Sequence, residues 1–180
     1  LRKALTLLQT GSTAGSQLRS LHADRKCDFY TIVKNIALFE FTTAFPGLFR
    51  LMFTLAAYSN QLRDPQVDEL NRAVLFLNKH QCLTQSVVTL FEKYPFSVTQ
   101  LALGCVFLNE HQLFTQPYMG LLEKGDGRFA KRWAELLADL KFFEALDPQL
   151  VNHLQRVSRP QMLLPKFSTI LTRQNLVLLR

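Results

Sequence analysis

The chain has 180 residues, of which 48% are hydrophobic and 19% charged, so it can bury a core of its own and is not intrinsically disordered. Only 7 glycines and 7 prolines are present, which excludes a collagen-like or low-complexity chain. The formal net charge of +7 makes an anionic partner one hypothesis to weigh.

Hydrophobic periodicity predicts helices throughout, and no alternating run flanked by hairpin turns predicts a strand. A short first helix and a linker-like segment are expected over residues 1–16, followed by a single all-helical domain over residues 17–180. The helices predicted within that domain cover Cys27–Phe41, Gly47–Leu62, 66–80, 86–93, 98–110, 116–123, 128–144, 148–157 and 161–170, with a last one from 173. The predicted fold class is all-α.

An internal repeat is visible in the second half of the chain. Residues 74–93 and 105–124 are identical at 10 of 20 gapless positions, with a period of 31 residues. Weaker copies follow in residues 142–154 and in ILTRQNLVLL, which begins at Ile170. We therefore predict stacked helical hairpins over about 66–180, preceded by an irregular helical N-terminal part.

All four copies of the repeat hold a threonine or an aspartate at one equivalent position, and either residue can cap a helix. A side-chain oxygen there can accept the unpaired backbone N–H groups of a first helical turn, and a proline often follows at the first helical position. Each unit is therefore predicted to be a helix, a tight turn, a cap and a shorter helix. The predicted caps are Thr84, Thr115, Asp147 and Thr172.

This unit resembles the α-helical repeat regions of Legionella effectors, large proteins that the Dot/Icm type IV system secretes into host cells. The resemblance covers about 73–180, and its matching residues are Leu77 to Gln85, Leu108 to Gln116, Leu146 to Leu150 and Leu171 to Leu176. Tetratricopeptide-like arrays are a competing source of paired helices, but their Trp-Leu-Gly-Tyr pattern is absent. The resemblance implies a fragment of a bacterial effector acting in the host cytosol, and it implies no catalytic residue. The first residue, Leu1, and the apolar run that ends at Arg180 also suggest a fragment.

The cysteines and histidines invite a metal hypothesis. His80 lies near Cys82, and Cys105 lies near His111, and zinc accepts both residue types. The repeat alignment pairs each of these cysteines with an aliphatic residue, which is typical of small core side chains. The histidines precede the turn and are expected to assist a helix C-terminus. We therefore expect free thiols in a reducing compartment, with no metal and no cofactor.

No motif for nucleophilic, metallopeptidase or phosphate-loop chemistry is present, so we expect no enzyme, although a cysteine and a histidine could still meet in space. The segment Gly125–Arg128 combines glycines with basic residues, as phosphate-binding turns do, but a sharp turn between helices is its ordinary explanation. The turn is the interpretation that we adopt.

The basic charge lies at the ends of the chain. Residues 1–30 carry +3, residues 31–147 carry −1 and residues 148–180 carry +5, which sum to +7. The C-terminal cations are spread among leucines and form no clustered basic face, which argues against nucleic acid and leaves an anionic membrane surface or an acidic partner. The predicted contacts with such a surface are Arg156, Arg159, Lys166 and Arg173.

The most apolar segment, residues 36–57, is interrupted by Glu40, Arg50 and the pair Pro46-Gly47. It therefore predicts buried core helices and no transmembrane segment, with a membrane-dipping hairpin around Pro46 as the alternative. The function expected is a non-enzymatic helical domain of a secreted effector that binds a host protein in the host cytosol. The alternative is a module that targets a larger effector to an anionic membrane or lipid surface.

Overall fold

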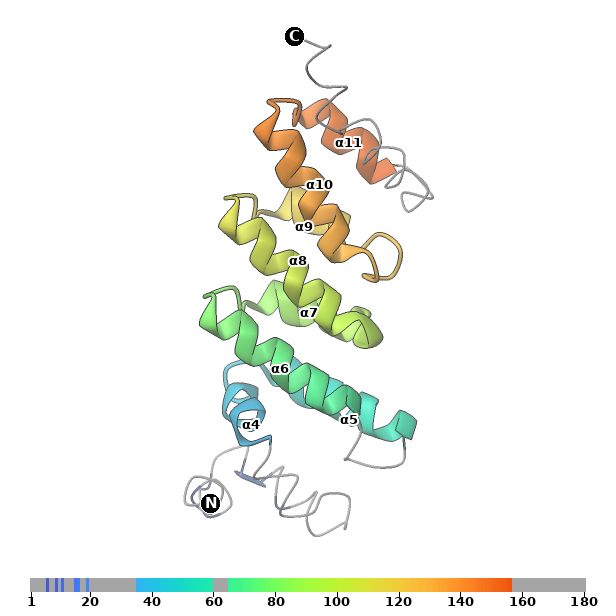
Figure 1. Cartoon of the computed structure of the whole chain (residues 1–180). Coiled ribbons are helices and arrows are strands. Elements are labelled where there is room, and N and C mark those ends of the chain that lie inside the picture. The colour runs from blue at the N-terminus through green and yellow to red at the C-terminus, as the bar shows by residue number, and fades with distance from the viewer. Residues whose placement is uncertain are drawn as a thin grey trace. The chain divides into compact units, whose positions relative to one another are not determined.

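The computed structural model describes residues 35–59 and 65–156, together with the isolated positions Thr6, Gln9, Gly11, Gly15, Ser16 and Arg19. Within these residues every regular element is a helix, which confirms the predicted all-α fold (Figure 1). The chain forms two compact units, Leu1–Val98 and Thr99–Arg180. The helices predicted over 161–170 and from 173 lie outside the described residues, and the boundary expected after residue 16 stays a prediction.

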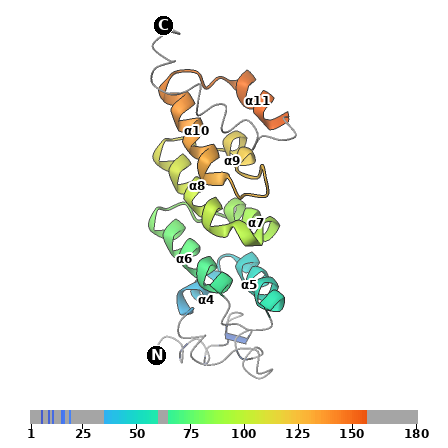
Figure 2. The same ribbon diagram turned by 45° about the vertical axis from the view of Figure 1, so that its right-hand side comes forward.

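Unit 1 is built from two layers of helices. α4 packs against α5 and α6, and α5 packs in turn against α6 and α7, so that α4 and α6 lie on one side and α5 and α7 on the other (Figure 2). Buried aliphatic and aromatic side chains fill the space between the layers. The elements are α4 (Ile36–Thr42), α5 (Pro46–Ser59), α6 (Pro65–Lys79), α7 (Gln85–Lys93) and the 3₁₀ helix η1 (Pro95–Ser97).

In unit 2 two longer helices, α8 and α10, alternate with two shorter ones, α9 and α11. α9 packs against both α10 and α11, and Trp133 of α10 is the largest fully buried side chain. The buried face of α10 includes Trp133, Leu136, Leu137 and Leu140, while Phe129 precedes the helix as its N-cap residue and is half-buried. The elements are α8 (Val98–Glu110), α9 (Gln116–Leu122), α10 (Ala130–Phe142) and α11 (Pro148–Arg156).

The apolar segment 36–57 lies in α4 and α5, and Pro46 occupies the first position of α5, where its missing N–H costs nothing. Leu38, Phe39, Leu48 and Leu55 are buried in unit 1, as expected of core helices. In the part of the chain that the structure describes, no helix is long and apolar enough to cross a membrane.

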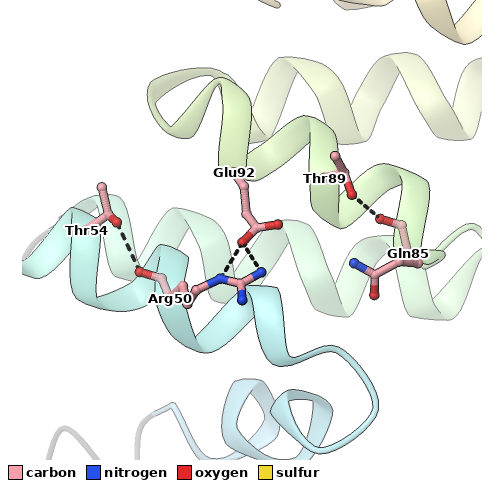
Figure 3. A network of polar contacts seen from close by, with 5 residues as sticks. All are labelled: Arg50, Thr54, Gln85, Thr89 and Glu92. Carbon is pink, nitrogen blue, oxygen red and sulfur yellow. Dashed lines mark hydrogen bonds and ion pairs between the residues drawn. The ribbon is translucent and has the colours of Figure 1, made fainter.

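In unit 1 an ion pair joins α5 to α7 across a glycine. Nε and Nη2 of Arg50 both lie 2.9 Å from Oε1 of Glu92 (Figure 3). A Cβ atom on Gly47 would lie 2.8 Å from the other carboxylate oxygen of Glu92 and from Cγ1 of Val88, so glycine makes this crossing possible. Because the Arg50 side chain is 71% exposed, the pair itself contributes at most about 1 kcal/mol.

In unit 2 two hydrogen bonds at one glutamine, Gln155 of α11, connect this helix to α9 and to the residues that follow α9. Nε2 of Gln155 donates a 2.8 Å hydrogen bond to the carbonyl of Pro117, and Nζ of Lys124 donates to the carbonyl of Gln155 itself. A cation at the last carbonyls of a helix also suits the negative end of its dipole. These bonds fix α11 against α9.

A close approach between two helices of unit 2 involves Gly104 of α8. A Cβ atom on Gly104 would lie 2.9 Å from the backbone carbon and oxygen of Ala130, which begins α10. Backbone atoms cannot rotate away as a side chain can, so α8 approaches α10 this closely only with glycine at position 104. Gly120 of α9 differs, because its nearest neighbour would be Nε2 of Gln155 at 3.8 Å.

We predict opposite effects for alanine at these two glycines. Gly104→Ala should lower the free energy of unfolding by about 1–2 kcal/mol, because the overpacking exceeds the gain in helix propensity. Gly120→Ala should raise it by about 0.5–1 kcal/mol, because its added methyl group meets no clash. Urea unfolding followed by circular dichroism measures both, and a stabilised Gly104→Ala variant would contradict the close approach.

Candidate interaction surface

Two of the predicted caps accept hydrogen bonds from backbone N–H groups in the structure. Oγ1 of Thr84 accepts from the backbone N of Val87 at 3.4 Å, at the start of α7. Oδ1 of Asp147 accepts from the backbone N of Leu150 at 2.7 Å, at the start of α11. The shorter bond to a charged acceptor should make Asp147 the stronger cap.

The prediction that the side chain of Thr115 caps a helix is wrong. Its backbone has the extended N-cap conformation before α9, but its side chain makes no capping hydrogen bond. Pro117 in the first turn has no N–H to donate, and the N–H groups of Tyr118 and Met119 donate to the carbonyl of Thr115 at 3.1 and 2.9 Å. The hydroxyl is therefore left without a donor in that turn.

Of the four predicted membrane contacts, Arg156 lies within the described residues. Arg156 is the last residue of α11 and is exposed. Arg159, Lys166 and Arg173, together with the predicted cap Thr172, lie outside the described residues. Over 35–59 and 65–156 the chain carries ten Lys and Arg against eleven Asp and Glu, so the described surface is close to neutral.

The cysteines and histidines do not converge on a metal site within the described ranges. Cys82 and Cys105 are not in disulfides and are fully buried, and these ranges hold no group of at least three potential ligands among His, Cys, Asp and Glu. The ring centroids of His80 and Phe76 lie 4.6 Å apart, and those of His111 and Phe107 are separated by the same distance. These histidines therefore pack on the preceding helical turn. Cys27 lies outside the described residues.

The glycine turn before α10 is left-handed at three successive residues. Gly125, Asp126 and Gly127 have φ values of 70°, 58° and 72°. Both neighbouring cations already have partners, because Arg128 contacts Asp126 at 3.4 Å and Lys124 donates to Gln155. The arrangement fits a sharp turn between helices, the interpretation adopted from the sequence.

The structure reveals a recurring feature that the sequence pattern did not predict. Gln81, Gln112 and Glu144 have φ values of 57°, 57° and 58°, in the left-handed region that glycine normally occupies after a helix. In each case the next residue donates its backbone N–H to a carbonyl five residues back. These bonds run from Cys82 to Leu77 at 2.8 Å, from Leu113 to Leu108 at 2.7 Å and from Ala145 to Leu140 at 2.8 Å.

Within unit 2 a side chain links two of these turns. Nζ of Lys141, in the last turn of α10, donates a 2.7 Å hydrogen bond to the carbonyl of His111, just after α8. The four residues from Lys141 to Glu144 form what we call the α10 end surface. It carries Phe142, whose side chain is 79% exposed and whose ring meets that of Phe143 edge-on at 5.0 Å.

One signal in the sequence could have identified this surface. The buried face of α10 recurs at Trp133, Leu137 and Leu140, and position 142 falls off that face. An aromatic residue off the buried face is a candidate contact residue. The left-handed turns carry no such signal, because glutamine and glutamate are not typical of that conformation.

Comparison with known proteins provides no relative: no family model, no curated protein and no solved structure matches the chain.

We predict that alanine has different effects at Asp147, whose side chain caps a helix, and at Thr115, whose side chain does not. Asp147→Ala should lower the free energy of unfolding by about 1 kcal/mol, because it removes the acceptor for Leu150. Thr115→Ala should change it by less than about 0.5 kcal/mol, since no capping bond is lost. Equal losses in urea unfolding of the two variants would contradict this assignment.

Proposed function

We propose that this chain is a non-enzymatic helical interaction domain of a secreted bacterial effector, and that it binds a host protein. The observation that carries the proposal is the exposure of large apolar side chains on otherwise well-packed helices. Leu75 of α6 is 42% exposed, Phe96 of η1 is 57% exposed and Phe142 at the end of α10 is 79% exposed. Aromatic side chains such as phenylalanine are enriched in the buried cores of protein interfaces.

The surroundings of these side chains favour a protein over a polyanion. Around Leu75, α6 exposes Glu69 and Arg72, which have opposite charges. The described ranges carry a net charge of −1, from ten cations and eleven acids. A near-neutral surface with exposed apolar residues suits a folded partner better than nucleic acid, whose affinity comes mainly from clustered cations.

The effector part of the proposal is supported by the resemblance of residues 73–180 to effector repeat regions. Burial of the thiols supports a non-enzymatic role, because Cys82 and Cys105 are fully buried and a buried thiol cannot reach a substrate in solvent.

A second candidate function is targeting to an anionic membrane surface. The observation in its favour is that His153 and Arg156 are both exposed in the last turn of α11, where the acid-free C-terminal segment begins. An exposed cation such as Arg156 can contribute to binding of an anionic lipid surface, with a strength that falls as salt rises.

We predict that Leu75 is needed for capture of the host partner. The immobilised full chain should enrich a protein from host-cell lysate, and Leu75→Asp should reduce its recovery at least about tenfold. Asn78→Asp is the matched control, because it introduces the same charge at an exposed position of the same helix and should leave recovery unchanged.

Two outcomes would count against a protein partner. One is the absence of any enriched protein. The other is equal recovery with Leu75→Asp, which would show that the exposed apolar residue of α6 is not involved. Sedimentation with phosphatidylserine vesicles tests the alternative, and salt-sensitive binding there would support membrane targeting.

A further inference from the structure

The α10 end surface combines an aromatic anchor with two charges of opposite sign. Phe142 is 79% exposed, more than any other large hydrophobic residue in the described part of the chain. Its ring meets Phe143 edge-on at 5.0 Å, which limits the orientations that it samples. Little conformational entropy would therefore be lost when another surface covers this ring.

The flanking charges have no ionic partner within the described residues. Lys141 donates to a neutral acceptor, the carbonyl of His111, and makes no ion pair. Glu144 makes no side-chain hydrogen bond or ion pair there, although Lys141 lies only three residues earlier. At φ 58° Glu144 has left the helical register in which residues three apart face each other, so the two charges do not neutralise each other along the helix.

A surface of this composition is complementary to itself. In a two-fold interface, residue i contacts residue j of the second copy while j contacts i. A copy turned about an axis through Phe142 would bring its Glu144 to Lys141 and its Lys141 to Glu144, with the two aromatic rings at the centre. An anionic membrane or a nucleic acid would attract Lys141 but repel Glu144, so neither fits as well.

We infer that the α10 end surface binds a second copy of this chain through a two-fold contact. Phe142 pairs with its equivalent, and Lys141 of each copy meets Glu144 of the other. The inference goes beyond the proposed host contact, because it involves only this chain and leaves Leu75 and Phe96 of unit 1 for another partner. A small contact of this kind gives a weak, concentration-dependent dimer.

The first test is the mass of the full chain by sedimentation equilibrium between about 5 and 500 µM, a range in which a weak contact dissociates. The wild type should shift from monomer to dimer, and Phe142→Ser should weaken the association at least about tenfold. Phe96→Ser is the matched control, because it removes the same ring from an exposed position in unit 1 and should dimerise as the wild type does.

The second test exchanges the charges. Glu144→Lys places two lysines opposite each other in the two-fold contact and should weaken the dimer about tenfold, by like-charge repulsion. Adding Lys141→Glu should restore it, since each glutamate then meets a lysine of the other copy. Circular dichroism of the single variants checks that the fold is kept, and Glu144→Lys breaks no side-chain bond within the described residues.

A chain that stays monomeric to about 500 µM would overturn the inference. So would a dimer that Phe142→Ser leaves intact, or a double charge exchange that fails to restore association. Host-protein capture through Leu75 is measured in a different experiment. Failure of the host-binding proposal and failure of the dimer proposal can therefore be distinguished.

Discussion

One backbone hydrogen bond organises each helical hairpin that the structure describes in full. It runs from the residue after a left-handed position to a carbonyl five residues back, and its acceptors are Leu77 in the last turn of α6, Leu108 in the last turn of α8 and Leu140 in the last turn of α10. All three leucines are buried, so their carbonyls need partners other than water. The bond supplies that partner and turns the chain toward the next helix, whose N-cap position follows three residues after Gln81, Gln112 or Glu144.

This arrangement has an energetic cost that the packing must offset. A non-glycine residue in the left-handed region costs roughly 1–2 kcal/mol, and the described chain carries that cost at Gln81, Gln112, Asp126 and Glu144. Glycine occupies the left-handed region at positions 125 and 127, and it is also found at positions 47 and 104, where a side chain or the backbone of another helix comes close. Glycine therefore serves two purposes in the described chain: a left-handed turn before α10, and room for two helices to come close.

Much of the fold could be predicted from the sequence because its signals were local. The spacing of apolar residues, together with the caps and prolines, predicted α8 at its observed bounds and α6, α7, α9 and α11 to within one residue at each end. The prediction for α10 extended to residue 144, because nothing in the side chain of Glu144 indicates a left-handed backbone. The regular stacking of repeats stays a prediction.

The interaction surface was harder to predict, because it depends on contacts between distant residues. The bond from Lys141 to the carbonyl of His111 joins residues 30 positions apart, and no residue pattern specifies it. The failure of Thr115 to cap was accessible in principle, since Pro117 removes a donor from the first turn. Of the predicted membrane contacts only Arg156 falls within the described residues, so that set remains a hypothesis.

The two buried thiols can report local unfolding of the protein. Cys82 belongs to unit 1 and Cys105 to unit 2, and neither side chain reaches solvent while its unit is closed. A thiol reagent can modify each one only during a transient opening of the helices around it, so the two labelling rates follow local unfolding in each half separately. With Cys27 replaced by serine, the chain would report which half opens first under denaturant, heat or partner binding.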